Sequence, residues 1–281
     1  MFEKNVGEYL SIDETSLSNG ELYTILSNKS GKGNQGTLVA MVAVTESSKV
    51  IGILKKISKS KRDTVKEITL DMAGSMNKIA ESCFPKANIV TDRFHVQKLA
   101  FDAVQEIRIA HRWQAIEKEN KAIKAARKAG KTYQANEYQN GDTLKQLLAR
   151  SRYLLFKSRN NWTTKQNARA KILFEVYSDL GKAYNLSDKL RKIYSHSKSK
   201  GIAFTKLAQW YNEVEKTDFK SFGTIVQTMK LHYSRILNCF DNKSTNASAE
   251  SFNAKIKAFR RTQRGVNDIS FFLYRVAKIF A

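Results

Sequence analysis

The sequence predicts an α/β fold in which a mixed sheet flanked by helices is interrupted by a large all-helical insertion. Three observations lead to this prediction. The first 54 residues show strand-like alternation, a β–α–β pattern lies between residues 65 and 92, and residues 96 to 239 show helical periodicity. The chain has 281 residues and one proline, a composition that favours long, uninterrupted helices.

The N-terminal region predicts three or four meandering antiparallel strands. In "VGEYLSIDETSL", Leu10 and Ile12 would share one face of the first strand, with Asp13 on the other face. The turn signal at residues 18–20 (Ser-Asn-Gly) then leads into a second strand. The remaining predicted strands are "ELYTILSN", "TLVAMVAV" and "KVIGIL".

A parallel unit follows. "VKEITLDM" predicts a strand that ends at Asp71, and "SMNKIAESCF" predicts a helix that Pro85 stops. "ANIVTD" predicts the next strand, which ends at Asp92. The preceding link "KKISKSKRDT" allows only about one helical turn, close to the ~10–12-residue minimum for a parallel crossover.

Changes in the pattern of apolar and basic residues along the chain predict three parts. Residues 1–96 form the first part of the sheet domain, 97–242 form the basic helical insertion, and 243–281 form C-terminal helices that complete the sheet domain. The three tryptophans are expected in the core. They are Trp113, Trp162 and Trp210.

The segment "NASAESFNAKIKAFRRTQRG" predicts a helix with two faces. At about 100° per residue, Phe252, Ile256 and Phe259 fall together and would face a core. Glu250 lies on the opposite face, which is otherwise basic or polar. The other members of that face are Asn253, Lys257, Arg261 and Arg264.

The charge balance indicates a polyanionic partner. Lys and Arg number 49 against 26 Asp and Glu, for a formal charge of +23. Nucleic acid is the simplest such partner, since phosphate contacts release condensed counterions, and an anionic membrane surface is the rival. Without a spanning apolar run or a signal peptide, we expect a cytoplasmic protein. Cys83 and Cys239 lack CxxC spacing and are expected in the core.

Three acids stand out by position. Asp13 and Asp71 each come at the end of a predicted strand, and Glu250 lies in the first turn of the last long helix. Taken singly, each is as readily a turn residue or a helix-dipole acid. Taken together at one sheet edge, they form a set that suits Mg²⁺, and two such ions can clamp an in-line phosphoryl transfer.

Four segments together resemble the bacterial insertion-sequence DDE transposases, in particular the ISL3-type group. They are "SIDETSL", "TLDMAGSM", "FPKANIVTDRFHVQKLA" and "NASAESFNAKIKAFRR". The resemblance implies an RNase H-like fold, a metal-bound Asp-Asp-Glu triad, and the cutting and joining of DNA ends.

The resemblance maps the first Asp of the triad to Asp13 and the Glu to Glu250, with Mg²⁺ or Mn²⁺ as the ligand. Asp71 or Asp92 would be the second Asp. Neighbouring strands lie ~4.8 Å apart, so Asp71 is expected beside Asp13 and Asp92 about twice as far away. This favours Asp71. Asp92, Arg93 and His95 resemble an accessory Asp-x-x-His motif that handles the DNA end.

The leading hypothesis is therefore a transposase that acts on double-stranded DNA, as a homodimer or a larger assembly on that DNA. The alternatives are an RNase H-like nuclease or resolvase that cuts without joining, and a basic nucleic-acid-binding protein without catalysis. In the helical insertion, phosphate contacts are expected from Lys121, Lys124, Arg127 and Lys128. Further DNA contacts are expected on the Glu250 face of the last long helix, from Asn253, Lys257, Arg261 and Arg264. We expect the terminal repeats to be recognised by a further N-terminal segment or by a separately encoded polypeptide.

Overall fold

A computed structural model describes residues 1–17, 20–263 and 268–281. It divides into two compact units. The sheet unit comprises residues 1–95, 198–200 and 231–281, and the helical unit comprises residues 96–197 and 201–230. The predicted turn at Ser18 and Asn19 lies outside the described residues, as does Arg264.

The sheet unit contains a mixed sheet of five strands within the described residues, in the order β3-β2-β1-β4-β5. The strands are β1 (Tyr9–Ser16), β2 (Leu22–Asn28), β3 (Leu38–Val42), β4 (Glu67–Leu70) and β5 (Asn88–Thr91). β1, β2 and β3 pair antiparallel, whereas β4 pairs parallel with β1 and with β5. This order and these directions are those of an RNase H-like sheet, as predicted.

The crossover from β3 to β4 differs from the prediction. "KVIGIL" is not a strand, because it lies in the helix α1 (Ser47–Leu54), and a further turn, α2 (Lys59–Arg62), follows it. Val50 and Leu54 stand four residues apart and are both buried, which places one face of α1 on the sheet. The connection between β3 and β4 therefore contains α1 and α2, and β1 and β4 pair in parallel beside it.

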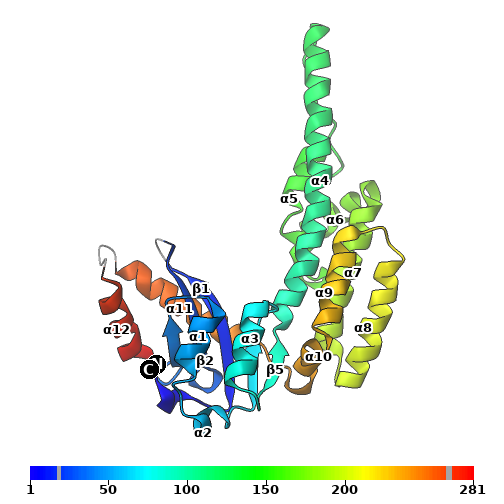
Figure 1. Ribbon diagram of the computed structural model, residues 1–281. Coiled ribbons are helices and arrows are strands. Elements are labelled where there is room, and N and C mark those ends of the chain that lie inside the picture. Colours follow the sequence, from blue (N-terminus) through cyan, green and yellow to red (C-terminus); the bar gives the residue numbers. More distant parts are fainter. Residues whose placement is uncertain (18–19, 264–267) are drawn as a thin grey trace. The chain divides into compact units, whose positions relative to one another are not determined.

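Helices cover both faces of the sheet (Figure 1). α1 and α3 (Gly74–Cys83) pack on one face, where Leu10, Ile12 and Ile68 are fully buried beneath them. α11 (Ala247–Thr262) and α12 (Ile269–Phe280) pack on the other face. The strand residues under α11 and α12 are Tyr23, Ile25 and Leu38.

The boundary of the helical segment lies earlier than residue 242. α10 (Tyr233–Asn242) belongs to the sheet unit because it packs along β5. There the side-chain amide of Asn238 donates to the Ile89 carbonyl at 2.9 Å and to the Asn88 side chain at 2.7 Å. α10 therefore covers the edge strand of the sheet, whose free backbone groups would otherwise be open to other chains.

The longest helix of the helical unit is α4 (Arg93–Lys128), which begins in the sheet unit. The unit's other helices are α5 (Leu144–Arg150), α6 (Thr164–Val176), α7 (Ser178–His196), α8 (Lys200–Glu215) and α9 (Lys220–Leu231). Residues 131–143 are not helical and contain an isolated bridge between Glu137 and Thr143. Asp142, fully buried, accepts hydrogen bonds from Arg150 and Arg169, and these ion pairs join α5 to α6.

The prediction for the tryptophans holds for Trp210, which is fully buried, but is wrong for Trp113, whose exposed fraction is 63%. Trp162 is half-buried and donates to the Leu154 carbonyl at 2.8 Å. Both cysteines are free and buried, as predicted. In the part of the chain that the structure describes, each helix is too short or too polar to cross a bilayer.

Candidate active site

The strand register aligns three aspartates across the sheet. Ser11 of β1 pairs with Thr69 of β4, so Asp13 and Asp71, each two residues further on, lie at the same level. Leu70 pairs with Thr91 of β5, which brings Asp92 level with Asp71 in the same way. Because paired residues on neighbouring strands point to the same face, the three carboxylates lie on one face, in the order Asp13, Asp71, Asp92.

One detail of the prediction is wrong. Asp13 does not lie at the end of its strand, because β1 continues to Ser16. Beyond Ser11 the strand pairs only with β2, whose antiparallel register reaches Leu22 opposite Ser16. Asp13 therefore lies on the part of β1 that extends beyond β4. There β1 pairs with β2 on one side and, within the described residues, with no strand on the other.

α11 brings two polar side chains, Glu250 and Asn253, near Asp13. Glu250 lies in its first turn and is exposed, and Asn253, one turn later, is buried. The side-chain amide of Asn253 donates to Asp13 Oδ2 at 2.6 Å. Phe252 and Ile256 anchor the opposite face of α11 in the core, so the predicted division of this helix into two faces is confirmed.

A second group of potential metal ligands lies at the end of β5. One potential ligand atom from each of Asp92, His95 and Glu250 lies within 4.8 Å of the others. Asp92 is buried, and its Oδ1 accepts from the Phe94 backbone N–H at 3.3 Å. Its Oδ2 has no hydrogen-bond partner among the described residues. A buried carboxylate oxygen without a partner is costly, so this atom is available to a cation.

The pKa of Asp13 is influenced by residues of both groups, namely Asp71 beside it and His95 and Glu250 at the end of β5. Burial raises the pKa of the Asp13 carboxyl from 3.8 to about 6. The Glu14 backbone N–H and His95 lower this pKa, while the charges of Asp71 and Glu250 raise it further. Like charges that meet in a partly buried site favour a proton or a metal cation to neutralise them.

A pH-dependent stability follows from the Asp13 carboxyl. Its pKa is about 6 in the folded chain, against the ordinary aspartate value of 3.8, so the folded chain binds the proton more tightly. Stability conferred by the protonated form is therefore lost as pH rises between these two values. We expect Asp13→Asn to raise the free energy of unfolding at neutral pH by ~1–3 kcal/mol in metal-free buffer.

Calorimetric melting at pH 4 and pH 7 measures this effect. The gain of Asp13→Asn should be present at pH 7 and absent at pH 4. Glu175→Gln, which changes an exposed acid of the helical unit, is the matched control and should show no such difference. A gain of equal size at both pH values would contradict the raised pKa.

The donor set fits a divalent cation that prefers oxygen. Carboxylates from β1, β4, β5 and α11 gather at one edge, with one imidazole beside them. Mg²⁺ takes one or two carboxylates and completes its shell with water and phosphate, and Mn²⁺ also accepts imidazole. Partners of the carboxylates, such as Asn253 on Asp13, fix their orientation.

The structure brings some of the predicted site residues together and leaves others apart. Asp13, Asp71, Asp92, His95 and Glu250 share one edge of the sheet unit. Of the residues predicted to bind DNA, Lys257 and Arg261 follow on α11, whereas the cations of α4 belong to the helical unit. Those cations are Lys121, Lys124, Arg127 and Lys128.

Sequence reasoning missed a charged network beneath the carboxylates. Lys29 forms an ion pair with the buried Glu67 at 3.1 Å and donates to the Thr69 hydroxyl. Asn242 donates to the other oxygen of Glu67 at 3.1 Å. Glu67, Thr69 and Asp71 alternate along β4, and this polar alternation in a buried strand was the signal that could have found the network.

Comparison with known proteins agrees with this geometry. A family model described as Transposase, of the ISL3-type DDE group, matches residues 10–276. The chain is also similar to "Transposase for insertion sequence element IS1001" from Bordetella parapertussis, with 22% identity over 277 residues. That match covers 97% of this chain and 61% of the relative, so the chain spans about three fifths of the relative's length.

Proposed function

This chain belongs to the ISL3-type family of DDE transposases, and from that premise we propose that it cuts DNA and joins the cut end to a second DNA site. The observation that carries the proposal is the convergence of carboxylates at one edge of an RNase H-like sheet. Asp13 and Asp71 stand level at neighbouring parallel strands, and Glu250 of α11 lies near enough to Asp13 to raise its pKa and within 4.8 Å of Asp92 and His95. The substrate would be double-stranded DNA.

We assign Asp13, Asp71 and Glu250 as the catalytic and metal-binding triad, with Mg²⁺ or Mn²⁺ as the ligand. Two divalent ions bound in such a site supply activation of the attacking oxygen and stabilisation of the leaving oxygen. The chain's own contribution is orientation. Asn253 holds one oxygen of Asp13, and the Ala73 backbone N–H donates to Asp71 at 2.8 Å, so both carboxylates are held in place.

Asp71 and Asp92 compete for the role of second acid. Adjacency to Asp13 supports Asp71, whose charge also raises the pKa of Asp13. The 4.8 Å grouping with His95 and Glu250 supports Asp92. We propose Asp71 as the triad member. Asp92 and His95 would then act on the far side of Glu250, where the imidazole can hold or release a proton beside the reacting phosphate, with Arg93 nearby as a phosphate contact.

A cationic cavity beside the carboxylates supports DNA binding. Lys257, Arg260 and Arg261 line a cavity of 290 Å³ together with Ser16 and Leu17. Arg260 is buried and paired with Glu21 at 2.7 Å, whereas Lys257 and Arg261 have no ion-pair partner among the described residues. These two cations lie on the Glu250 face of α11, so we propose that they bind the phosphates flanking the cut.

The basic helices should make DNA binding steeply dependent on salt. A protein that contacts 6–10 phosphates loses about 10³–10⁵ in affinity between ~50 and ~200 mM salt. Lys121→Gln combined with Lys128→Gln on α4 should weaken binding and reduce the slope of log K against log salt by about two. Lys78→Gln, on the α3 face of the sheet away from α11, should leave the slope unchanged. Salt-independent binding would contradict this electrostatic account.

A strand-transfer assay tests the proposed reaction. Labelled DNA that contains an element end is incubated with the chain in Mg²⁺, in Mn²⁺ and in a chelator. We expect nicked DNA and a longer, joined product with either metal, and neither product with the chelator. Nicking without joined product would support a nuclease, and binding without nicking would support a DNA-binding protein.

A further inference from the structure

The exposed face of α4 in the helical unit carries an apolar strip. Trp113 is 63% exposed, Ile109 42% and Ile123 41%, although other apolar residues of the same helix, such as Val104 and Ala115, are buried. At about 100° per residue, these three residues and two others fall within about 80° of one another. The strip comprises Ile109, Trp113, Ile116, Asn120 and Ile123.

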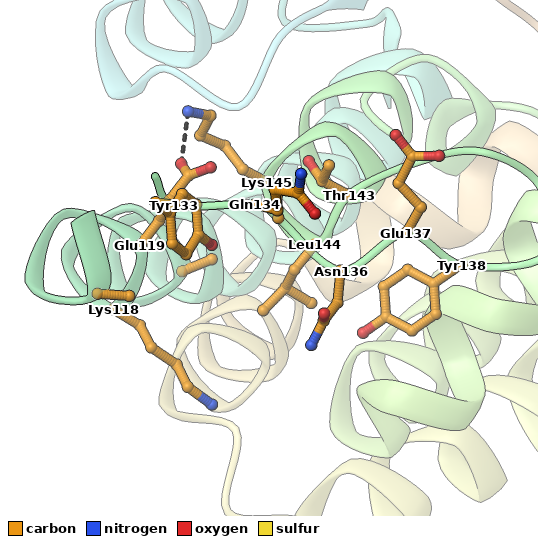
Figure 2. Close-up of a pocket in the computed structure, with 13 residues that line it drawn as sticks. Lys118, Glu119, Tyr133, Gln134, Asn136, Glu137, Tyr138, Thr143, Leu144 and Lys145 are labelled. Atoms are coloured by element: carbon orange, nitrogen blue, oxygen red, sulfur yellow. Dashed lines mark ion pairs between the residues drawn. The ribbon is translucent and has the colours of Figure 1, made fainter. Parts of the chain in front are cut away.

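The strip faces away from the body of its own unit. The buried residues of α4 nearest to it in sequence, Arg108 and Ala115, lie on a different side of the helix. The loop that contains Tyr133 and Tyr138 lies on the same side as Ala115, and together with Ala115 and Lys118 it lines a cavity of 470 Å³. Figure 2 shows the side chains that line this cavity. The chain's own loops therefore cover another side of α4 and leave the strip exposed.

The spacing within the strip is 4-3-4-3, which is the a/d pattern of a coiled coil. Ile109, Ile116 and Ile123 take the d positions, and Trp113 and Asn120 take the a positions. The next a position is Arg127, which ends the apolar strip. An apolar seam that repeats every 3.5 residues fits another helix with the same repeat, because each side chain enters a hole between four residues of the partner.

We propose that this strip joins two copies of the chain as a parallel two-stranded coiled coil. In a parallel pair, Asn120 meets Asn120 of the second copy, and the two amides can hydrogen-bond. In an antiparallel pair, each Asn120 would face an isoleucine and lose its partner. The flanking charges also agree, since Arg112 at g lies opposite Glu117 at e of the second copy.

The length of the strip sets the expected strength. It spans just over two heptads, fewer than the three or four of a stable isolated coiled coil. We therefore expect association in the micromolar range. The exposed cations Lys121 and Lys128 lie outside the seam, so DNA binding by α4 and pairing through the strip can occur together.

Sedimentation equilibrium of the full chain without DNA tests the pairing. We expect a monomer–dimer equilibrium at micromolar chain concentration. Ile123→Lys should weaken it by at least about tenfold, because it places two charges in one d layer. Ala125→Lys adds the same charge to the same exposed turn about 200° around the helix, and should have no effect. A monomeric wild-type chain, or equal effects of the two variants, would overturn the proposal.

Disulfide cross-linking tests the parallel orientation. Cys83 and Cys239 are buried, so a new surface cysteine is the reactive one. Asn120→Cys should cross-link two copies under mild oxidation, whereas the matched variant Lys121→Cys should not. Cross-linking at 121 but not at 120 would overturn the seam. A monomeric chain whose Trp113→Ala variant loses DNA affinity would instead assign the strip to DNA.

Discussion

Asp71→Asn should lower metal-dependent nicking of end-containing DNA by about a thousandfold or more, while DNA binding persists. The expected size follows from the loss of one carboxylate from a two-metal site, which removes several kcal/mol of transition-state stabilisation. Asp13→Asn and Glu250→Gln should have effects of similar size, because Asp13 neighbours Asp71 and Glu250 reaches the same edge. Single-turnover nicking rates in Mg²⁺ and in Mn²⁺ measure this.

Asp92→Asn is the decisive comparison. It changes a carboxylate at the same level of the sheet and on the same face as Asp71, one strand further from Asp13. If Asp71 is the second acid, Asp92→Asn should retain nicking that Asp71→Asn lacks, with an altered pH profile because His95 and Glu250 lie beside Asp92. Full nicking by Asp71→Asn together with none by Asp92→Asn would reverse the assignment.

Binding must be measured on the same variants. Each Asp→Asn change removes a negative charge from the site, so DNA affinity should stay constant or rise slightly. A variant that loses both binding and nicking would indicate damage to the fold, and its melting temperature would show this. The Asp13→Asn variant is informative here, because it should be inactive and yet more stable than the wild-type chain at neutral pH.

The sheet was predictable from the alternation of the first strands and from the β–α–β pattern that follows them, and the helix α1 was not. In "KVIGIL", Val50, Ile51 and Leu54 are spaced as on a helix, yet a short run rich in Val, Ile and Leu after a turn also fits a strand. The polar residues before this run are equally ambiguous, because Glu46, Ser47 and Ser48 would fit a turn between strands, whereas in the structure Glu46 precedes α1 and the two serines begin it. Short apolar runs carry both periodicities, and the packing of α1 against α3 and the sheet decides between them.

The candidate site was predictable as a set of residues and not as a geometry. Position after a strand and residue type identified Asp71 and Asp92, and position in the first turn of an otherwise basic helix face identified Glu250. The contact of Asn253 with Asp13 depends on how α11 packs across the sheet, and no local pattern reports that packing. The same holds for Lys29, which reaches Glu67 from a loop 38 residues earlier in the chain.

Trp113 shows a third kind of failure. A tryptophan in a globular chain is usually buried, so the core was the natural prediction. The 4-3-4-3 spacing around it was nevertheless present in the sequence, and it is typical of a helix that pairs with another helix. The spacing becomes informative once the structure shows that the strip points away from the chain's own core.

The two faces of α11 separate stability from activity, and two substitutions should show it. Phe252 is fully buried, and its ring packs edge-on against Phe280 with 5.1 Å between ring centroids. Phe252→Ala should lower the free energy of unfolding by ~3–5 kcal/mol, because it leaves a cavity between α11 and α12. Chemical denaturation measures this loss.

Lys257→Glu should do the opposite. Lys257 is half-exposed, lines the cationic cavity and forms no ion pair within the described residues, so its reversal removes no core contact. It would, however, repel a phosphate beside Glu250. We expect strand transfer to fall by about tenfold to a hundredfold, the effect of ~1.4–2.8 kcal/mol, with little change in melting temperature.

Ala258→Glu, an exposed neighbour on the same helix, is the control for added charge and should retain most of the activity. Equal losses of stability for Phe252→Ala and Lys257→Glu would mean that the two faces of α11 do not divide in this way. Equal losses of strand transfer for Lys257→Glu and Ala258→Glu would mean that general repulsion, and not a phosphate contact at Lys257, lowers the rate.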